Sequence, residues 1–280
     1  MHHDRVGIFV DQSNINASGG FNMDYTVLRD FALRGGSRAV HMNVYSSLDP
    51  AKLEKDPTLA GRVQGYHSAV KALGYNITVK LAKHFDDGDR VVVKSNVDME
   101  IAVDVLEGAG RLDRVVILTG DGDFAPLIRA ARRLGVRVEV IAVDSCSADL
   151  REAADAVFNA WLIPGLLPAQ SEMDKKYASW GQPGSRVRGT VDNVDNENKT
   201  LTIRYVKPWA NANDLALLAP LAPMYQGVAI CDIADIKRSD QGVLRGAIVE
   251  FTLQGVLDDI GAATEVAMHR FATRSGWYRS

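Results

Sequence analysis

The feature that most constrains the fold is a regular alternation of apolar and helix-like segments along the first half of the chain. Most of the apolar segments are short runs rich in Val, Ile and Leu, which is typical of strands buried on both faces. Strands are expected at residues 6–10, 39–45, 76–80, 114–118 and 136–143. Helices are expected at residues 25–33, 59–73, 98–106, 124–134 and 148–158. The pattern predicts an α/β fold with a mainly parallel sheet between two layers of helices.

The pattern changes in the second half of the chain. Prolines, glycines and serines between weak signals predict a linker at residues 164–184, so that the first domain covers residues 1–163. From 185 to 280, short apolar segments alternate with polar turns, which predicts a small β-barrel as the second domain. Residues 207–226 are expected to interrupt this barrel as an insertion.

The composition excludes several classes of protein. The chain has 32 Lys and Arg against 35 Asp and Glu, so any surface that attracts nucleic acid must be local. Two distant cysteines, Cys146 and Cys231, exclude a disulfide scaffold and a CxxC zinc site. No apolar run approaches the ~18 residues of a spanning helix, and the N-terminus lacks a signal-peptide pattern. We therefore expect a soluble, cytoplasmic protein without a membrane partner.

Acidic residues occur where the predicted strands end. Asp11 ends the first strand, and Asp121 and Asp123 follow the fourth, so all three are expected at the carboxyl edge of the sheet, where ligands bind. Asp98 begins a helix, on its apolar side. Converging carboxylates repel one another unless a cation is present, and Mg²⁺ or Mn²⁺ prefers oxygen ligands. The sequence thus predicts a divalent-metal site that activates water for phosphodiester hydrolysis.

Taken singly, these acids also have structural interpretations. Asp11 is a favourable N-cap for a following helix. The Asp-Gly-Asp sequence at residues 121–123 is a common turn. Asp104 shares the polar face of its helix with Glu100 and Glu107, which is typical of a solvated surface. Only the grouping of several acids at one edge favours a site.

Three segments together resemble a known family. The residues that carry the resemblance are Phe9–Asn14, Lys94–Asp98 with Ala102–Asp104, and Thr119–Phe124. They resemble the three motifs of NYN domains, and most closely those of the LabA-like branch of the PIN-like nuclease superfamily. The resemblance extends from residue 5 to about residue 162. It implies a PIN-like three-layer α/β/α sandwich that holds Mg²⁺ or Mn²⁺ and acts on RNA.

The resemblance also implies roles for individual residues. The positions that match the metal-binding and catalytic acids are Asp11, Asp98, Asp121 and Asp123. The supporting positions are Ser13, Asn14, Lys94, Asp104 and Thr119. All four acids are present, so the motifs contain no sign of an inactive site.

A basic helix face follows the third motif. Arg129, Arg132 and Arg133 are three and four residues apart, which places them on one face of the predicted helix. Such a face beside a metal cleft could bind the phosphates of a single-stranded RNA substrate. The alternative is a solvated surface without a ligand. The acidic segment at residues 86–89 is interpreted as a polar loop.

The second domain is similar, more faintly, to a cold-shock-type OB-fold. The similarity rests on residues 189–191, 246–251 and 261–266. Such folds bind single strands through stacking aromatic residues on their second and third strands, and residues 200–203 and 228–230 contain none. Tyr205, Trp209 and Tyr225 could replace them or could belong to the core. This domain is therefore expected to bind RNA, a protein partner or a second copy of the chain.

The leading hypothesis is a metal-dependent ribonuclease, and two alternatives remain. One is a catalytically silent adaptor that binds RNA or protein. The other is a phosphatase or nucleotide-handling enzyme with Asp11 as nucleophile. The sequence disfavours the latter because Ser13 stands where a second Asp would be needed and no GxxxxGK[ST] loop is present.

Overall fold

The computed structural model describes residues 3–86, 91–94, 96–143, 145–169, 180–207, 226–236, 245–257 and 260–268. The chain divides into two compact units. The first contains Met1–Phe21 and Leu28–Phe158, and the second contains Asn22–Val27 and Asn159–Ser280. The domain boundaries expected at residues 163 and 185 stay predictions. None of the described helices is long and apolar enough to cross a membrane.

The first unit is built on a six-stranded sheet with the order β3-β2-β1-β6-β7-β8. Its strands are β1 Arg5–Asp11, β2 Arg38–Leu48, β3 Asn76–Leu81, β6 Arg114–Leu118, β7 Arg137–Ala142 and β8 Ala156–Asn159. Neighbours from β3 to β7 all pair in parallel, which confirms the predicted mainly parallel sheet. The central strand β6 is buried along its whole length, as its apolar sequence requires.

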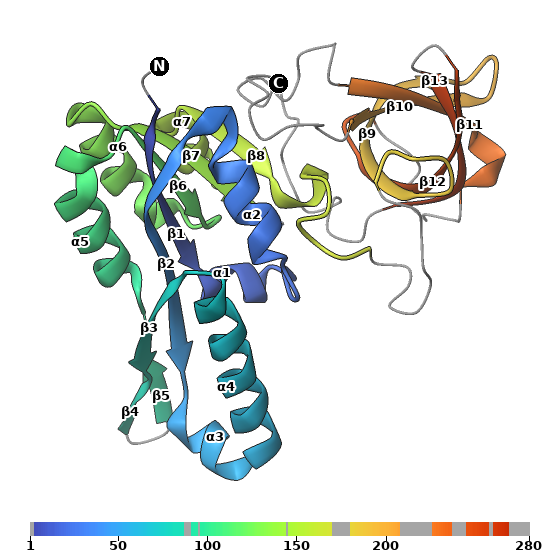
Figure 1. Cartoon of the computed structure of the whole chain (residues 1–280). Coiled ribbons are helices and arrows are strands. Elements are labelled where there is room, and N and C mark those ends of the chain that lie inside the picture. The colour runs from blue at the N-terminus through green and yellow to red at the C-terminus, as the bar shows by residue number, and fades with distance from the viewer. Residues whose placement is uncertain are drawn as a thin grey trace. The chain divides into compact units, whose positions relative to one another are not determined.

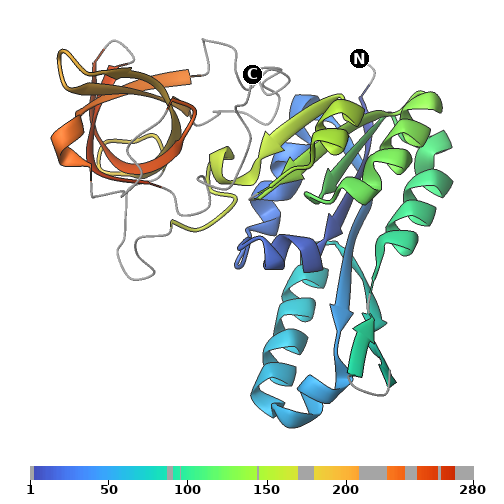
Figure 2. The same ribbon diagram turned by 180° about the vertical axis from the view of Figure 1, so that it is seen from behind.

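Helices cover both faces of this sheet. They are α1 Gln12–Ala17, α2 Tyr25–Ala32, α3 Pro50–Lys55, α4 Pro57–Ala72, α5 Asp98–Gly108, α6 Ala125–Arg133 and α7 Ala148–Ala153. Short 3-10 helices include η1 Arg34–Gly36, η2 Ala109–Arg111, η3 Gly122–Phe124 and η4 Ala160–Leu162. Opposite views show α5 and α6 on one side of the sheet and α2 on the other (Figures 1 and 2). The predicted α/β class is confirmed.

One predicted helix is partly wrong. The helix expected at residues 148–158 ends at Ala153, and the chain continues as strand β8. The reason is a tertiary contact. The Asp155 N–H donates to the carbonyl of Val138 at 2.9 Å, and the Val138 N–H donates to the Asp155 carboxylate at 2.8 Å. These two bonds hold the chain extended beside β7.

An arm projects beyond the carboxyl end of β1, formed by the end of β2, α3, α4 and a small hairpin (Figure 1). The hairpin pairs β4 Lys83–Asp86 with β5 Val91–Lys94 in antiparallel register. Asp49 and Asp56 cap α3 and α4, and a proline begins each helix. Residues 87–89 of the predicted polar loop lie outside the described residues.

The second unit contains a closed barrel with the order β10-β11-β13-β12-β9. Its strands are β9 Arg186–Asp195, β10 Thr200–Val206, β11 Gln226–Asp232, β12 Ile248–Leu257 and β13 Ile260–Met268, and η7 Ile233–Asp235 follows β11. The pair of β11 and β13 is parallel, and the other four pairs are antiparallel. This confirms an OB-like barrel as the C-terminal element.

The barrel core explains one aromatic residue that the sequence left open. Tyr205 is 4% exposed and meets Phe251 edge to face, with ring centroids 6.0 Å apart. Its strand partner is Gly227, where an added Cβ would lie 2.2 Å from the Tyr205 ring. Tyr205 is therefore a core residue and offers no stacking surface. Trp209 and Tyr225, with most of the predicted insertion, lie outside the described residues.

Candidate active site

Asp11 stands where β1 ends and α1 begins. Its side chain is an N-cap whose Oδ1 accepts a hydrogen bond from the Asn14 N–H at 3.0 Å. Its Oδ2 accepts one from the Thr119 hydroxyl at 3.5 Å, just after β6. Asp11 is 4% exposed and Thr119 is fully buried. The ends of two neighbouring strands therefore fix this carboxylate at the carboxyl edge of the sheet.

The loop after β6 is tied to the same place. The Gly120 N–H donates to the Asn14 side-chain oxygen at 2.9 Å, and the Asp121 N–H donates to the Thr119 hydroxyl at 3.2 Å. Asp121 in turn caps η3 by accepting from the Asp123 N–H at 2.9 Å. Asp11 and Asp121 each cap a helix, and each also lies at the carboxyl edge of the sheet. The interpretation as a cap and the interpretation as part of a site therefore apply to both residues.

Two glycines allow this loop to approach the segment before α7. A Cβ on Gly120 would lie 2.0 Å from the Ser145 carbonyl oxygen, and one on Gly122 would lie 2.7 Å from the Ser147 hydroxyl. The Ser147 N–H also donates to the Gly120 carbonyl at 3.3 Å. The glycines of Thr119–Phe124 are therefore required by close packing, which places Asp121 and Asp123 beside the loop after β7.

The acids influence one another electrostatically. Burial raises the pKa of Asp11 to about 6; the Asn14 N–H opposes this shift, while the charges of Asp98 and Asp121 add to it. Burial also raises the pKa of Asp98; Asn96 opposes this shift through a hydrogen bond, while Asp121, Asp123 and Glu100 add to it. Because like charges raise a carboxyl pKa only at short range, the predicted acids share one region.

The donor set fits a hydrated divalent cation. It is made of carboxylate oxygens, which suit Mg²⁺ and Mn²⁺, and a cation would offset both the burial and the repulsion that raise the pKa values of Asp11 and Asp98. Among the described residues, no three His, Cys, Asp or Glu side chains form a ready-made metal cage. Mg²⁺ does not need one, because it usually keeps several waters and takes one or two carboxylates directly.

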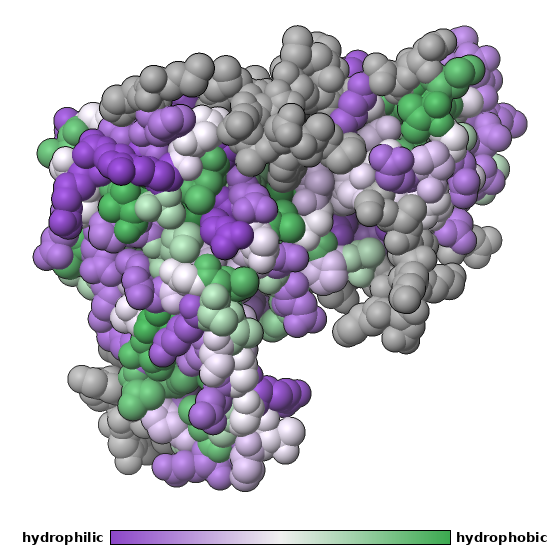
Figure 3. Space-filling view, in the orientation of Figure 1, coloured by the Kyte–Doolittle hydropathy of each residue, from purple (hydrophilic) through white to green (hydrophobic). Residues whose placement is uncertain are grey.

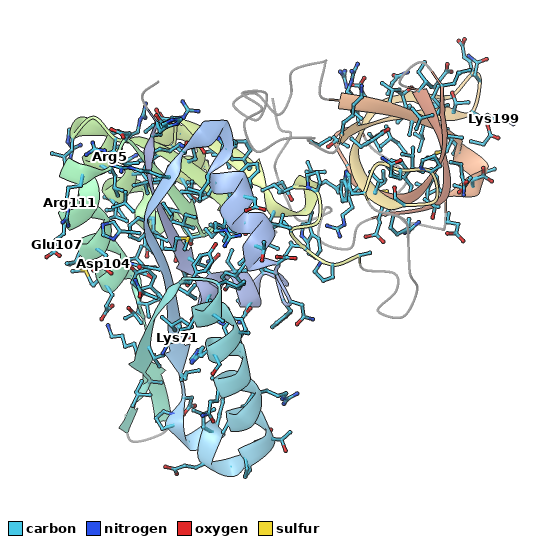
Figure 4. The ribbon with its side chains drawn as sticks, in the orientation of Figure 1. Arg5, Lys71, Asp104, Glu107, Arg111 and Lys199 are labelled. Carbon is cyan, nitrogen blue, oxygen red and sulfur yellow. The ribbon has the colours of Figure 1, made fainter. Side chains whose placement is uncertain are left out.

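The structure gives Asp104 a partner that the sequence did not indicate. Asp104, labelled on α5 in Figure 4, accepts a hydrogen bond from the Tyr45 hydroxyl at 2.5 Å. Tyr45 also accepts one from the Asn43 side chain at 3.1 Å. Tyr45 is fully buried and pairs with Asp11 in the register of β1 and β2. Asp104 is partly exposed, as its polar helix face predicts, and it also joins α5 to the sheet beside Asp11.

Sequence reasoning missed Tyr45 and Asn43. The available signal was a tyrosine at the end of the second predicted strand, where Asp11 ends the first. A second missed contact is the ion pair between Lys80 of β3 and Glu100 of α5, at 2.7 Å. Both contacts hold α5, and with it Asp98, against the strands.

The remaining predicted residues divide into two groups. The Ser13 N–H lies at Asp11 and lowers the pKa of that carboxyl, against the effect of burial. Lys94 ends β5, and its side chain lies outside the described residues. Arg129, Arg132 and Arg133 lie toward the far end of α6, whose nine residues span about 13 Å. The structure thus gathers Ser13 with the acids and separates Arg132 and Arg133 from Asp123.

Three comparisons relate this chain to known proteins. The model of the NYN domain family matches residues 5–162. The chain is 31% identical over 159 residues to "Low amplitude and bright protein LabA" of Synechococcus elongatus, which covers 54% of this chain and 81% of that relative. It also resembles the crystal structure of a protein of unknown function from Vibrio parahaemolyticus, at 25% identity and a TM-score of 0.47, over 56% of this chain and 93% of the other.

The family match spans more than half of the chain and contains every acid at the carboxyl edge. Together with the parallel sheet and the closed barrel, it decides the classification. The chain belongs to the NYN-domain family, in the LabA-like branch of the PIN-like nuclease superfamily, and carries an OB-like barrel after the NYN domain.

Proposed function

We propose that this protein is a ribonuclease that uses Mg²⁺ or Mn²⁺ to hydrolyse phosphodiester bonds of single-stranded RNA. The observation that carries the proposal is the placement of Asp11 and the Asp121 loop at one edge of the sheet, where Thr119 and Asn14 join them by hydrogen bonds and the charges of Asp98 and Asp121 add to the raised pKa of Asp11. A buried carboxyl with a pKa of about 6, surrounded by other acids, is typical of a functional site that is completed by a cation.

In this proposal the four predicted acids, Asp11, Asp98, Asp121 and Asp123, hold the cation. When bound, the cation supplies an activated water and offsets charge on the phosphoryl oxygen. Thr119 and Asn14 keep Asp11 and the loop after β6 in place through the hydrogen bonds described above. The Tyr45–Asp104 contact keeps α5, which begins with Asp98, at the same edge.

The barrel is proposed to bind the substrate or a protein partner, and the protein is proposed to act in the cytoplasm. Of the described residues on β10 and β11, none offers an exposed aromatic ring for base stacking. Within the described part of the barrel, the exposed large apolar side chains are instead aliphatic: Ile230, Val256, Leu257 and Ile260. A space-filling view shows an apolar patch over β11 and β13 (Figure 3). This favours a protein contact over stacking on RNA bases.

The test is cleavage of a single-stranded RNA by the purified full-length protein with Mg²⁺ or Mn²⁺. The Asp11→Asn/Asp121→Asn double variant is expected to lose at least about 100-fold in rate, because it removes two ligands of the cation. The matched control is Glu107→Gln, which changes an exposed acid on α5 (labelled in Figure 4) and should keep the wild-type rate. Cleavage retained by the double variant would show that a contaminating nuclease is responsible.

A second measurement separates the enzyme from a catalytically silent adaptor. Calorimetric titration with Mn²⁺ should detect binding to the wild type and not to Asp98→Asn. A protein that binds RNA, but neither cleaves it nor binds Mn²⁺ through Asp98, would be the adaptor.

A further inference from the structure

The edge of the sheet opposite the acids is rich in arginine. Four strands of the parallel sheet begin with this residue: β1 with Arg5, β2 with Arg38, β6 with Arg114 and β7 with Arg137. Because the strands are parallel, their first residues lie together at the amino edge. Helix α6 runs toward the same edge and ends on Arg133.

The carboxylates at the amino edge are fewer than the arginines, although Asp113 pairs with Arg5 at 3.0 Å and Asp4 lies 3.8 Å from Arg114. Glu139 is fully buried and lies 2.7 Å from Arg34, 2.9 Å from Arg137 and 3.6 Å from Arg114. One carboxylate is thus shared among three guanidinium groups. Burial lowers the pKa of Arg114, and the neighbouring charge of Arg34 lowers it further. The edge therefore carries excess positive charge.

Part of this charge surrounds an open hollow of about 570 Å³ at the end of α6. We call it the arginine hollow. Its charged lining residues are Arg129, Arg132, Arg133, Arg137 and Asp155. Among the residues that the structure describes, four cations face one anion there and no aromatic side chain is part of the lining.

The four arginines are not equivalent. Arg132 is held by Asp155 at 2.9 Å and by the Ala153 carbonyl at 2.8 Å, and Arg137 is held by Glu139. Arg129 and Arg133 are exposed, and neither has an ion pair or a side-chain hydrogen bond within the part of the chain that the structure describes. Two positioned and two available guanidinium groups are suited to phosphate oxygens, which Arg binds through two parallel N–H donors.

We propose that the arginine hollow binds phosphates of an RNA strand at a distance from the bond that is cleaved. The proposal rests on the proposed ribonuclease function. Helix α6 joins the two places, since Asp123 lies just before its first turn and Arg129 and Arg133 lie along it toward the hollow. A lining of guanidinium groups without aromatic rings recognises phosphates and not bases, so this contact carries no sequence preference. Short RNA reaches only the acids, and longer RNA also reaches the hollow.

The test measures RNA binding by the full-length protein in EDTA, so that no cleavage occurs. Single strands from about 4 to about 16 nucleotides are compared by fluorescence anisotropy at several salt concentrations. The wild type should gain affinity with length. Arg129→Gln/Arg133→Gln should bind the longest strand about tenfold more weakly, and the slope of log affinity against log salt should fall by about 1.4, or ~0.7 for each lost contact.

The matched control is Lys55→Gln/Arg62→Gln, which removes two exposed positive charges from α3 and α4 at the far end of the NYN domain. It should keep the wild-type gain of affinity with length. Thermal unfolding of both double variants checks that they are folded. An unchanged length dependence in Arg129→Gln/Arg133→Gln, or an equal loss in the control, would overturn the proposal.

Two further results separate the possible failures. If inorganic pyrophosphate or ATP binds the wild type through Arg129 and Arg133 while RNA affinity is unaffected by the variant, the hollow is a site for small polyphosphates and the proposal is wrong. If the length effect is present but the wild type cleaves no RNA with Mg²⁺ or Mn²⁺, the hollow is supported and the nuclease assignment fails.

Discussion

The two edges of the NYN sheet carry opposite charges: acids gather at the carboxyl edge and arginines at the amino edge. At the carboxyl edge, Asp11 and Asp98 are buried or half-buried beside further acids, and their hydrogen-bond donors are neutral backbone and side-chain groups. At the amino edge, the buried acid Glu139 is surrounded by arginines. The buried acid of the amino edge thus receives its counter-charges from the protein, whereas the buried acids of the carboxyl edge depend on a bound cation for theirs.

The barrel offers a second comparison with the arginine hollow. Arg188 is 3% exposed and donates to Glu250, to the Trp161 carbonyl and to the Leu167 carbonyl. Arg186 also pairs with Glu250, at 3.3 Å. These arginines are fully engaged within their own unit, so they are structural. Arg129 and Arg133 of the hollow are exposed and have no such partners among the described residues, which leaves them available to a ligand.

The largest expected effect tests the amino edge. Glu139→Gln leaves Arg34 and Arg114 buried without their shared carboxylate, so we expect the free energy of unfolding to fall by about 3–5 kcal/mol. Urea denaturation measures the change. Glu152→Gln, at an exposed acid on α7, is the control and should change it by less than about 0.5 kcal/mol. Equal effects of the two variants would contradict the role given to Glu139.

The next effect tests whether a cation completes the carboxyl edge. Mn²⁺ at about 100 times its dissociation constant should raise the free energy of unfolding of the wild type by about 2.7 kcal/mol, because it binds only the folded state. The gain should be much smaller in Asp11→Asn. Thermal unfolding with and without Mn²⁺ measures both values. A full gain in the variant would place the cation elsewhere.

The third prediction is an increase in the free energy of unfolding, whereas Glu139→Gln is expected to decrease it. Removing an acid at the carboxyl edge should stabilise the metal-free protein, because Asp11 is a buried charge among like charges. A rise of its pKa from 3.8 to about 6 corresponds to about 3 kcal/mol of destabilisation by the ionised form. Asp11→Asn keeps a cap oxygen for Asn14 and should therefore raise the free energy of unfolding by about 2 kcal/mol near pH 8.

The effect of Asp11→Asn on stability should depend on pH, in a direction that follows from the pKa shift of Asp11. The folded-state pKa of Asp11 lies above the unfolded value, so the folded state binds the proton more tightly. The destabilisation is complete well above the folded pKa of about 6, decreases as the pH falls toward 3.8 and is lost below 3.8, where both states are protonated. The advantage of Asp11→Asn should disappear over the same interval in chelator-treated protein. An advantage that does not vary with pH would show that charge is not its cause.

The smallest effect concerns the support of α5. Tyr45→Phe removes the hydrogen bond to Asp104, and we expect a loss of about 1 kcal/mol. The loss is moderate because Asp104 is partly exposed and can regain water. Chemical denaturation measures it, with Ser68→Ala, which removes an exposed hydroxyl from α4, as the control. No difference between the two variants would mean that this contact does not stabilise the site.

Much of the NYN domain could be predicted from sequence because the relevant signals are local. Apolar runs such as the one at residues 114–118 indicate buried strands by composition alone. Because parallel strands all run in the same direction, Asp11 and Asp121, which follow two of them, lie at the same edge of the sheet. The same reasoning did not identify the partner of Asp104. Tyr45 is 59 residues away along the chain, and no local pattern connects the two.

The tertiary structure alone decided which charges meet. Local patterns in the sequence were sufficient to predict the parallel α/β class, the grouping of acids after the strands and the presence of a second, strand-rich region. Only the packed chain showed that residues 156–159 form a strand, that Tyr205 is a core residue and that Arg132 and Arg133 lie at the other end of α6 from Asp123. The physical reason is range, because secondary-structure periods act over a few residues, while the Arg34–Glu139 pair joins positions 105 residues apart.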